Sequence, residues 1–229
     1  QDLPFGRLTA GGQISYVNYS CAYGLDPTDI QDLSRGEMEC RQYVMDIYRY
    51  LKTHFTELKG TEIASIAPEI GFRDSRRIDG MYRLTIDDME SGRHFEDCIA
   101  VFPRFYDMLS PDANMDGDGK VEGKGYVGHI YEPVVDDRTF EIPYGSLVPK
   151  NVDNLLAAGR CISADHVAES GTRAISLCMM TGEAAGAAAA LALQTGKKPG
   201  HICVKQLQRM LREQNIHIPN LGEEAEECV

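Results

Sequence analysis

The stretch "TGEAAGAAAALAL", from Thr181 to Leu193, consists almost entirely of small residues. Its continuous apolar character and the glycine at Gly196 predict a helix within Ile175 to Thr195. Small side chains allow such a helix to lie very close to a sheet or to a flat ligand. We expect its Thr181-Gly182 end to offer unpaired amides and a partial positive charge, which would suit an anion. Tight packing against a sheet explains the same composition without any ligand.

The residues on either side of this helix predict further regular structure. Upstream, "NLLAAG", from Asn154 to Gly159, is a continuous apolar run that predicts a short buried strand. Downstream, apolar residues at helical spacing predict a last helix; they are Val204, Leu207, Met210 and Leu211.

The first half of the chain has the pattern of one long helix followed by strands. "SRGE" predicts a capping box between Ser34 and Glu37 that opens a helix running to about Leu58, with Met38 on its buried face. The runs "EIASIA", "GMYRLTI", "CIAVF" and "RTFEIPYGSLV" predict strands of a mixed sheet. The expected fold class is therefore α/β, with one domain portion over residues 1–145 and a second over residues 146–229.

Composition excludes several classes of partner. The chain has 35 acidic and 23 basic residues, and its net charge of -12 argues against nucleic acid or an anionic membrane as the main partner. The longest apolar run, Ala184 to Leu193, falls short of the roughly 20 residues that cross a bilayer, so we expect no membrane span. Seven cysteines without a C-x-x-C pair predict reduced thiols and a cytoplasmic protein.

A glycine-rich loop carries two motifs that suggest ligands. "GKGYVG", from Gly123 to Gly128, has the spacing G-x-G-x-x-G, but the residues after it are poor helix formers, so we interpret the match as fortuitous. Just before it, "DANMDGDGKVEG" has the oxygen ligands of a Ca²⁺ loop but Gly123 in place of the last glutamate. A polar solvent loop explains the same residues. The candidate metal ligands are Asp112, Asn114, Asp116 and Asp118.

The combined order of several segments points to one family. "IPYGSLVPKNVDNLLAAGRCIS" and "TRAISLCMMTGEAAGAAAALAL" resemble the C-terminal half of the FAD-dependent oxidoreductases, relatives of the glutathione-reductase-type flavoproteins. "IAPEIGFRDSRRIDGMYRLTIDDMESGRHFEDCIA" resembles the middle region of the same family. The resemblance covers most of residues 30–215. It implies a substrate-domain portion, a C-terminal segment that closes the FAD-binding domain, and hydride transfer between a small organic substrate and flavin.

The resemblance also implies which residues contact FAD. Gly159 and Arg160 would lie beside the ribityl-pyrophosphate part, where glycine allows a close backbone approach. Thr181 and Gly182 would face the pyrimidine edge of the flavin ring. Met180 would pack against the ring, although a role as core filler is an equal alternative.

Four residues are candidates for the substrate side of the site. Arg77 in "SRRIDG" would offer a bidentate fork to a substrate carboxylate, and an ordinary surface ion pair is the alternative. His129 would carry a proton, unless its role is structural. Tyr144 and Arg173 would line the pocket.

One part of the family pattern is missing from these 229 residues. Family members begin with a βαβ unit whose G-x-G-x-x-G loop binds the ADP half of FAD. We therefore expect FAD binding to need a partner chain or a further segment that carries this unit. Two alternatives remain: a calcium-binding or adhesion-type module, and a non-catalytic structural subunit.

Overall fold

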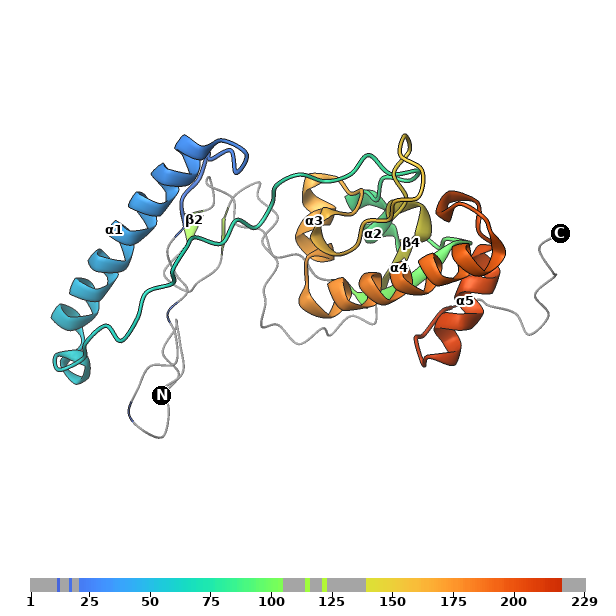
Figure 1. Ribbon diagram of the computed structural model, residues 1–229. Helices are drawn as coiled ribbons and strands as arrows, with labels where there is room; N and C mark the ends of the chain where they lie inside the picture. Colours follow the sequence, from blue (N-terminus) through green and yellow to red (C-terminus); the bar gives the residue numbers. More distant parts are fainter. Residues whose placement is uncertain are drawn as a thin grey trace. The chain divides into compact units, whose positions relative to one another are not determined.

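The computed structural model describes Gly12, Val17, and residues 21–104, 114–115, 121–122 and 139–219. The chain divides into two compact units, Gln1–Ser75 and Arg76–Val229, which we call unit 1 and unit 2 and describe separately (Figure 1). This division does not coincide with the expected boundary after residue 145. The reason is that the strand just before residue 145 shares one core with the segments that follow it.

Unit 1 is built around α1 (Ile30–His54), which is followed by the short 3-10 helix η1 (Thr56–Leu58). The predicted capping box at Ser34 is wrong, because Asp29 comes earlier in the chain and caps the helix: its carboxylate accepts the Gln31 amide at 2.9 Å. Ser34 therefore lies inside the helix, where its hydroxyl donates to the Ile30 carbonyl at 2.9 Å.

The rest of α1 also departs from the expected pattern. Glu37 does not reach back to Ser34; its carboxylate accepts the Ile70 amide at 2.6 Å and so ties the helix to the returning chain. Met38 is 67% exposed, and the fully buried positions of α1 are Gly36 and Leu51. The expectation that Met38 lies on a buried face is therefore wrong.

The sheet of unit 2 has two antiparallel strands, β1 (Cys98–Pro103) and β4 (Thr139–Pro143), with Phe102 opposite Phe140. Both strands confirm predicted apolar runs. Among the described residues, "EIASIA" forms no strand, and "GMYRLTI" makes only single bridges from Gly80 and Leu84. A second short pair joins β2 (Asn114–Met115) to β3 (Val121–Glu122). The mixed sheet predicted from the sequence is thus reduced to small antiparallel pairs in the described part of the chain.

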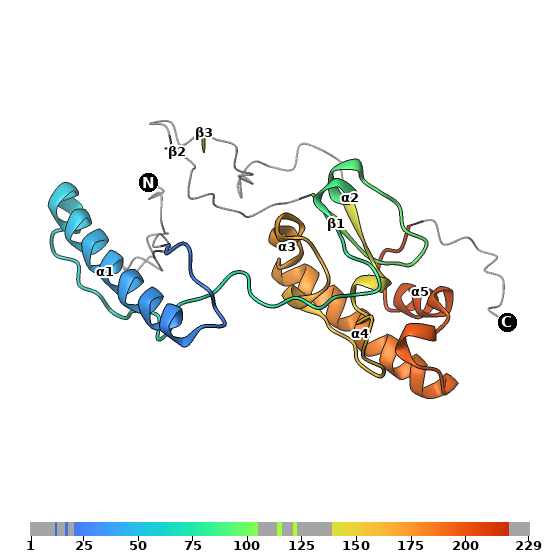
Figure 2. The ribbon, with the colours of Figure 1, turned by 90° about the horizontal axis from the view of Figure 1, so that it is seen from above.

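Helices supply most of the regular structure of unit 2. They are α2 (Ile86–Ser91), α3 (His166–Thr172), α4 (Ile175–Thr195) and α5 (Val204–Glu213), with the 3-10 helices η2 (Tyr144–Ser146), η3 (Gly159–Cys161) and η4 (Pro199–His201). Figure 2 shows α4 running along the β1-β4 pair with α5 beside it. The predictions of α4 and α5, and of the helix stop at Gly196, are confirmed.

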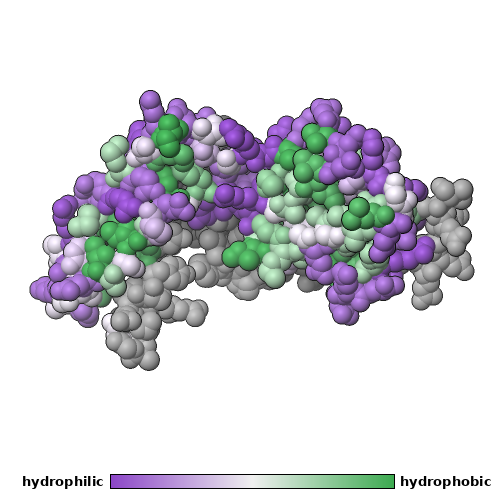
Figure 3. All heavy atoms as spheres, viewed as in Figure 1, coloured by the Kyte–Doolittle hydropathy of each residue, from purple (hydrophilic) through white to green (hydrophobic). Residues whose placement is uncertain are grey.

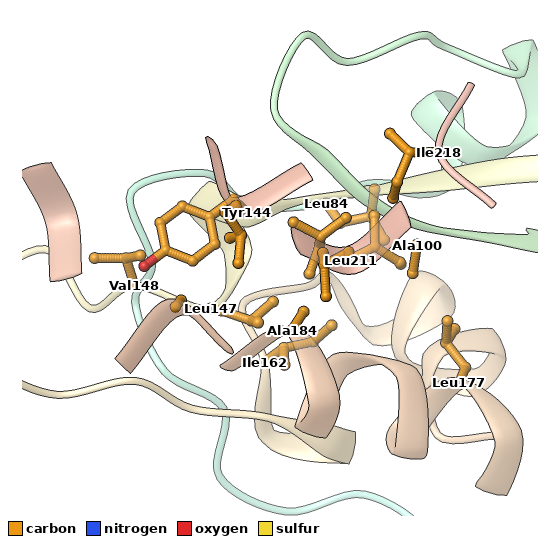
Figure 4. Close-up of a cluster of buried hydrophobic side chains, with 14 of the residues drawn as sticks. Leu84, Ala100, Tyr144, Leu147, Val148, Ile162, Leu177, Ala184, Leu211 and Ile218 are labelled. Carbon is orange, nitrogen blue, oxygen red and sulfur yellow. The ribbon is translucent and has the colours of Figure 1, made fainter. Parts of the chain in front are cut away.

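One core holds these elements together. It collects buried side chains from the strands, from α4 and from α5, as the close-up in Figure 4 shows. The small residues of α4 let the helix approach the sheet, because Ala184 and Ala188 are fully buried where larger side chains would separate the two. The labelled members of the core are Leu84, Ala100, Tyr144, Leu147, Val148, Ile162, Leu177, Ala184, Leu211 and Ile218.

Helix α4 also has the length and apolarity of a membrane span, whereas the apolar run Ala184 to Leu193 considered in the sequence is shorter. A third of its apolar window (33%) is buried inside unit 2. Its outward side exposes Ile175, Met179 and Leu193. Figure 3 shows hydrophobic surface where Figure 1 places α4. A core helix meets the same length and composition criterion, which is therefore weak evidence for a span.

The cysteines depart from expectation at one position. Cys203 is disulfide-bonded, so the prediction that all thiols are reduced is wrong there. The free cysteines of the described residues are Cys21, Cys40, Cys98, Cys161 and Cys178.

Helix α2 is not among the predicted elements, although its signals are present in "TIDDMESG". Thr85 and Asp88 form a capping box, and Gly92 ends the helix with a left-handed φ of 61°. The Asp88 carboxylate is buried and accepts hydrogen bonds from Tyr82, Thr85 and Arg93 at 2.8 to 3.0 Å. This carboxylate therefore joins the start of α2 to the chain on both sides of it.

The Asp88 network predicts a dependence of stability on pH. Burial alone would raise the pKa of Asp88, but the hydrogen bonds from Thr85, Tyr82 and Arg93 outweigh it and lower that pKa. A lowered pKa in the folded state gives stability that is present above the unfolded value of about 3.9 and lost as the pH falls through the folded value. We expect Asp88→Asn to lower the free energy of unfolding by about 1–3 kcal/mol at pH 7, and the deficit to shrink below about pH 4.

Urea unfolding at about pH 7 and about pH 3, on either side of the unfolded value, measures this difference. The matched control is Asp87→Asn, because Asp87 lies in the same turn and is exposed. An equal loss of stability in both variants, or a deficit for Asp88→Asn that is unchanged in acid, would contradict the prediction.

Candidate functional site

The centre of the candidate site is η3, the turn Gly159–Cys161. Gly159 has φ of 78°, a left-handed conformation that favours glycine. Its amide donates to the Thr181 hydroxyl at 3.0 Å, and this hydroxyl donates to the Cys178 carbonyl at 3.0 Å. Thr181 is fully buried. One side chain therefore holds the turn against α4.

The environment of Thr181 and Gly182 differs from the expected helix end. Helix α4 begins at Ile175, after Ala174, which makes no side-chain capping hydrogen bond. Thr181 and Gly182 thus lie in the second turn, and the prediction that they form an end with unpaired amides is wrong. The cause is that nothing in "ISLCMM" interrupts the helix before Thr181. Gly182 is exposed and Met180 is partly buried against the core.

The segment leading into the turn forms no strand among the described residues, so the predicted buried strand is not formed there. The Ala157 amide of this segment donates to the Leu147 carbonyl at 2.9 Å. Leu155 is 46% exposed, and Asn154 has a positive φ of 56°. Strands β1 and β4 pair with each other, and neither pairs with this segment.

The structure brings the segment of Arg77 to this turn. The Ile78 amide donates to the Cys161 carbonyl at 2.9 Å, which places the neighbouring Arg77 next to η3. Further along, Leu84 and Ala164 form a parallel bridge, so the two segments continue side by side. Arg160 is exposed on the turn itself. The predicted substrate and cofactor arginines therefore belong to adjoining segments of unit 2.

Arg173 borders the same region from α3. It is the C-cap residue of that helix, and its Nε lies 3.7 Å from Oε2 of Glu169, whose side chain is 3% exposed. The Cys178 thiol donates to the Thr172 carbonyl at 3.6 Å and so links the end of α3 to the first turn of α4. The positive charge of Arg173 is thus paired with a buried carboxylate.

Tyr144 lies in a different environment from the one expected. It is buried in the core, and its hydroxyl donates to the Pro199 carbonyl at 2.9 Å (Figure 4). Burial raises the pKa of Tyr144. Because the hydroxyl is used in holding η4 to the core, Tyr144 takes no part in the function proposed below.

The remaining predicted residues are the candidate proton carrier and the candidate metal ligands. His129, Asp112, Asp116 and Asp118 lie outside the described residues, and Asn114 is described only by its place in β2. Within the described part of the chain, no three His, Cys, Asp or Glu side chains converge on a possible metal site.

The hydrogen bonds of Thr181 lead to a testable prediction. Thr181→Val keeps the shape of the side chain but leaves the Gly159 amide without its acceptor, so we expect a loss of about 1–3 kcal/mol in the free energy of unfolding. Hydrogen exchange of the Gly159 amide should also become faster.

The control is Thr195→Val in the same helix. Thr195 is exposed, and its hydroxyl donates only within α4, to Leu191 and Ala192. We expect a change within about 0.5 kcal/mol. Unfolding in urea and amide exchange measure both effects, and unchanged Gly159 exchange in Thr181→Val would refute the role of this hydroxyl.

Sequence reasoning did not predict that Cys178 packs against the turn that contains Cys161. Cys178 lies under Gly159, because a Cβ placed on this glycine would be 3.8 Å from the Cys178 sulfur. No spacing motif links Cys178 to this turn, so only the packing of η3 on α4 reveals the contact.

Comparison with known proteins bears on the whole of this region. A family model described as FAD dependent oxidoreductase matches residues 6–211. No curated protein and no solved structure matches the chain.

Proposed function

Because the chain belongs to the FAD dependent oxidoreductase family, we propose that it supplies the C-terminal part of a flavin site and part of the adjoining substrate site. The cofactor of the family is FAD, and its chemistry is oxidation and reduction. The finer assignment to a glutathione-reductase-like arrangement, with hydride transfer to or from a small organic substrate, is part of this proposal.

The observation that carries the proposal is the turn Gly159–Cys161, held against α4 by Thr181. A glycine in a left-handed conformation leaves its backbone open to close approach by a ligand. The exposed Arg160 beside it carries a guanidinium suited to a phosphate oxygen. These features fit the ribityl-pyrophosphate part of FAD, with Gly182 and Met180 nearer the ring.

A second part of the proposal concerns the rest of the FAD site. Within the described part of the chain, segment 155–158 makes a backbone–backbone hydrogen bond at Ala157 and pairs with no strand, and Ala158 is extended, so the segment can accept a neighbouring strand. Helix α4, which contacts the turn that follows this segment, exposes Met179 and the glycines Gly182 and Gly186. We propose that a βαβ unit with a G-x-G-x-x-G loop, on a partner chain or a further segment, packs here and holds the ADP half.

On the substrate side, Arg77 is the proposed anchor for a carboxylate, because its segment adjoins the same turn and its guanidinium can form a bidentate pair. FAD, when bound, supplies the acceptor or donor of a hydride. His129 is the proposed carrier of the accompanying proton. Arg173, whose charge is paired with Glu169, would border the substrate side of the site.

Native mass spectrometry of the protein purified from its source tests the proposal. We expect one FAD in a particle that contains the βαβ unit. A particle without flavin would refute the FAD site. Stoichiometric flavin on the 229 residues alone would refute the need for the second unit while leaving FAD binding in place.

The role of Arg160 is tested separately in that particle. Arg160→Ala is expected to weaken FAD retention by about tenfold or more, as for loss of a charge-assisted phosphate contact. Arg83→Ala is the matched control, because Arg83 is also exposed and lies in unit 2. Equal retention in both variants would exclude the phosphate contact.

A further inference from the structure

A pocket of about 380 Å³ lies in unit 2 between Met81 and the segments 148–155 and 198–201. This volume falls at the lower end of the range for small-molecule sites, about 300–1,000 Å³. Of the described residues proposed above to contact FAD or the substrate, none lines this pocket. The pocket is therefore a separate feature of the fold.

The pocket also differs in position from the proposed FAD turn. Segment 198–201 follows the C-terminal end of α4, whereas the turn at Gly159 is held by Thr181, in the second turn of the same helix. The helix rises about 20 Å between Thr181 and its last residue, Thr195. A ligand beside segment 198–201 and FAD at the turn would therefore occupy different places.

Hydrogen bonds and close packing fix the walls of the pocket. The Met81 amide donates to the Val148 carbonyl at 2.8 Å, and the Tyr144 hydroxyl donates to the Pro199 carbonyl at 2.9 Å. A Cβ placed on Gly200 would lie 3.4 Å from Cγ1 of Val148 and 3.5 Å from the Met81 sulfur, so η4 packs closely on the facing wall. Walls that are already in place reduce the cost of ordering the site when a ligand binds.

Apolar side chains remain exposed at this pocket. Met81, Val152 and Leu155 all line it, and all three are exposed to solvent. Covering apolar surface is favourable by about 25 cal/mol per Å². The pocket therefore favours a ligand with an apolar body.

Positive groups border the same pocket, although the chain has a net charge of -12. Lys150, Lys198 and His201 line it, and Asp153 supplies the one carboxylate among its described lining residues. Lys198 Nζ lies 2.6 Å from Oδ2 of Asp153, and Lys150 Nζ lies 2.8 Å from Oδ1 of Asp79. Both pairs are exposed and therefore weak, and each ammonium group has further N–H donors for an anion.

We propose that this pocket binds a small organic anion, with a compact apolar body and one carboxylate. The body covers the exposed side chains of Met81, Val152 and Leu155, and the ammonium groups of Lys150 and Lys198 attract the carboxylate. The same body with a positive charge binds more weakly, because the lysines repel it. This binding does not depend on FAD.

Naphthoate, which has two fused apolar rings and one carboxylate, is the probe for the full chain. Naphthylmethylamine is the comparison, because it has the same rings and a positive charge. Binding is followed by NMR of isotope-labelled methionine methyl groups, and the Met81 signal is assigned by its loss in Met81→Leu. We expect naphthoate to shift this signal saturably and naphthylmethylamine to bind about tenfold more weakly or worse.

Charge reversal tests the part of the lysines. Lys150→Glu and Lys198→Glu should each weaken naphthoate binding by about tenfold or more and strengthen the binding of naphthylmethylamine. The matched control is Lys205→Glu, because Lys205 is also exposed in unit 2 but does not line the pocket. We expect naphthoate to bind this variant as it binds the wild type.

Truncation tests the apolar part of the pocket. Leu155→Ala should weaken naphthoate binding, whereas Leu193→Ala, at an exposed position outside the pocket lining, should not. Equal affinity for the two probes would indicate a plain apolar contact surface, such as one that a protein partner covers, and would overturn the proposal. The absence of a saturable Met81 shift, or equal naphthoate affinity in all three lysine variants, would overturn it as well.

Discussion

Leu177→Ala is expected to lower the free energy of unfolding by about 2–5 kcal/mol, because the truncation leaves a cavity at a fully buried position of α4. Leu177 belongs to the core that α4 shares with the strands and α5. The helix has no side-chain cap at Ala174, so its position depends mainly on this packing. Thermal and urea unfolding measure the change.

Leu193→Ala is the matched control, since it makes the same chemical change in the same helix at a side chain that is 85% exposed. We expect a change within about 0.5 kcal/mol. Similar losses for the two variants would contradict the assignment of the inner and outer sides of α4.

Gly80→Ala is expected to cost about 1–3 kcal/mol through overpacking. A Cβ at Gly80 would lie 2.6 Å from the Cβ of Ser163 and 3.0 Å from the carbonyl oxygens of Gly145 and Tyr82. Two of these contacts are with backbone, and Ser163 is itself held by the bond from its amide to the Ser146 carbonyl. The neighbours therefore have little room to move.

Gly186→Ala provides the comparison for Gly80→Ala. Gly186 lies within α4, and a Cβ there would meet nothing within 4 Å. Replacing a glycine inside a helix should stabilise the fold by up to about 1 kcal/mol. Urea unfolding should thus give changes of opposite sign, and a loss of stability in both variants would refute the steric explanation.

Elements with local signals can be predicted from the sequence. The end of α4 at Gly196 and the apolar runs of β1 and β4 are confirmed, because a left-handed glycine and a continuous apolar run act within a few residues. The start of α1 differs from the prediction because two capping residues compete there, and Asp29 comes first. Helix α2 was not predicted, although Thr85 and Asp88 form the capping box that marks its start.

The candidate site can be predicted only in part. The resemblance names the family and points to Gly159, Arg160 and Thr181, and the family match confirms the first of these conclusions. The residue roles remain predictions. The hydroxyl of Thr181 as the link to Gly159, and the burial of Tyr144, depend on contacts between distant segments that no local pattern encodes.

Order and composition along the chain are sufficient to establish the family, the small-residue helix and the residue at which that helix ends. Three further features depend on the packing of distant segments. Thr181 holds the turn at Gly159, the segment of Arg77 adjoins that turn, and Cys178 packs against Gly159. These features cannot be predicted from the sequence, because the fold decides which distant residues a side chain contacts. The same side chain can accordingly be a ligand or a core residue.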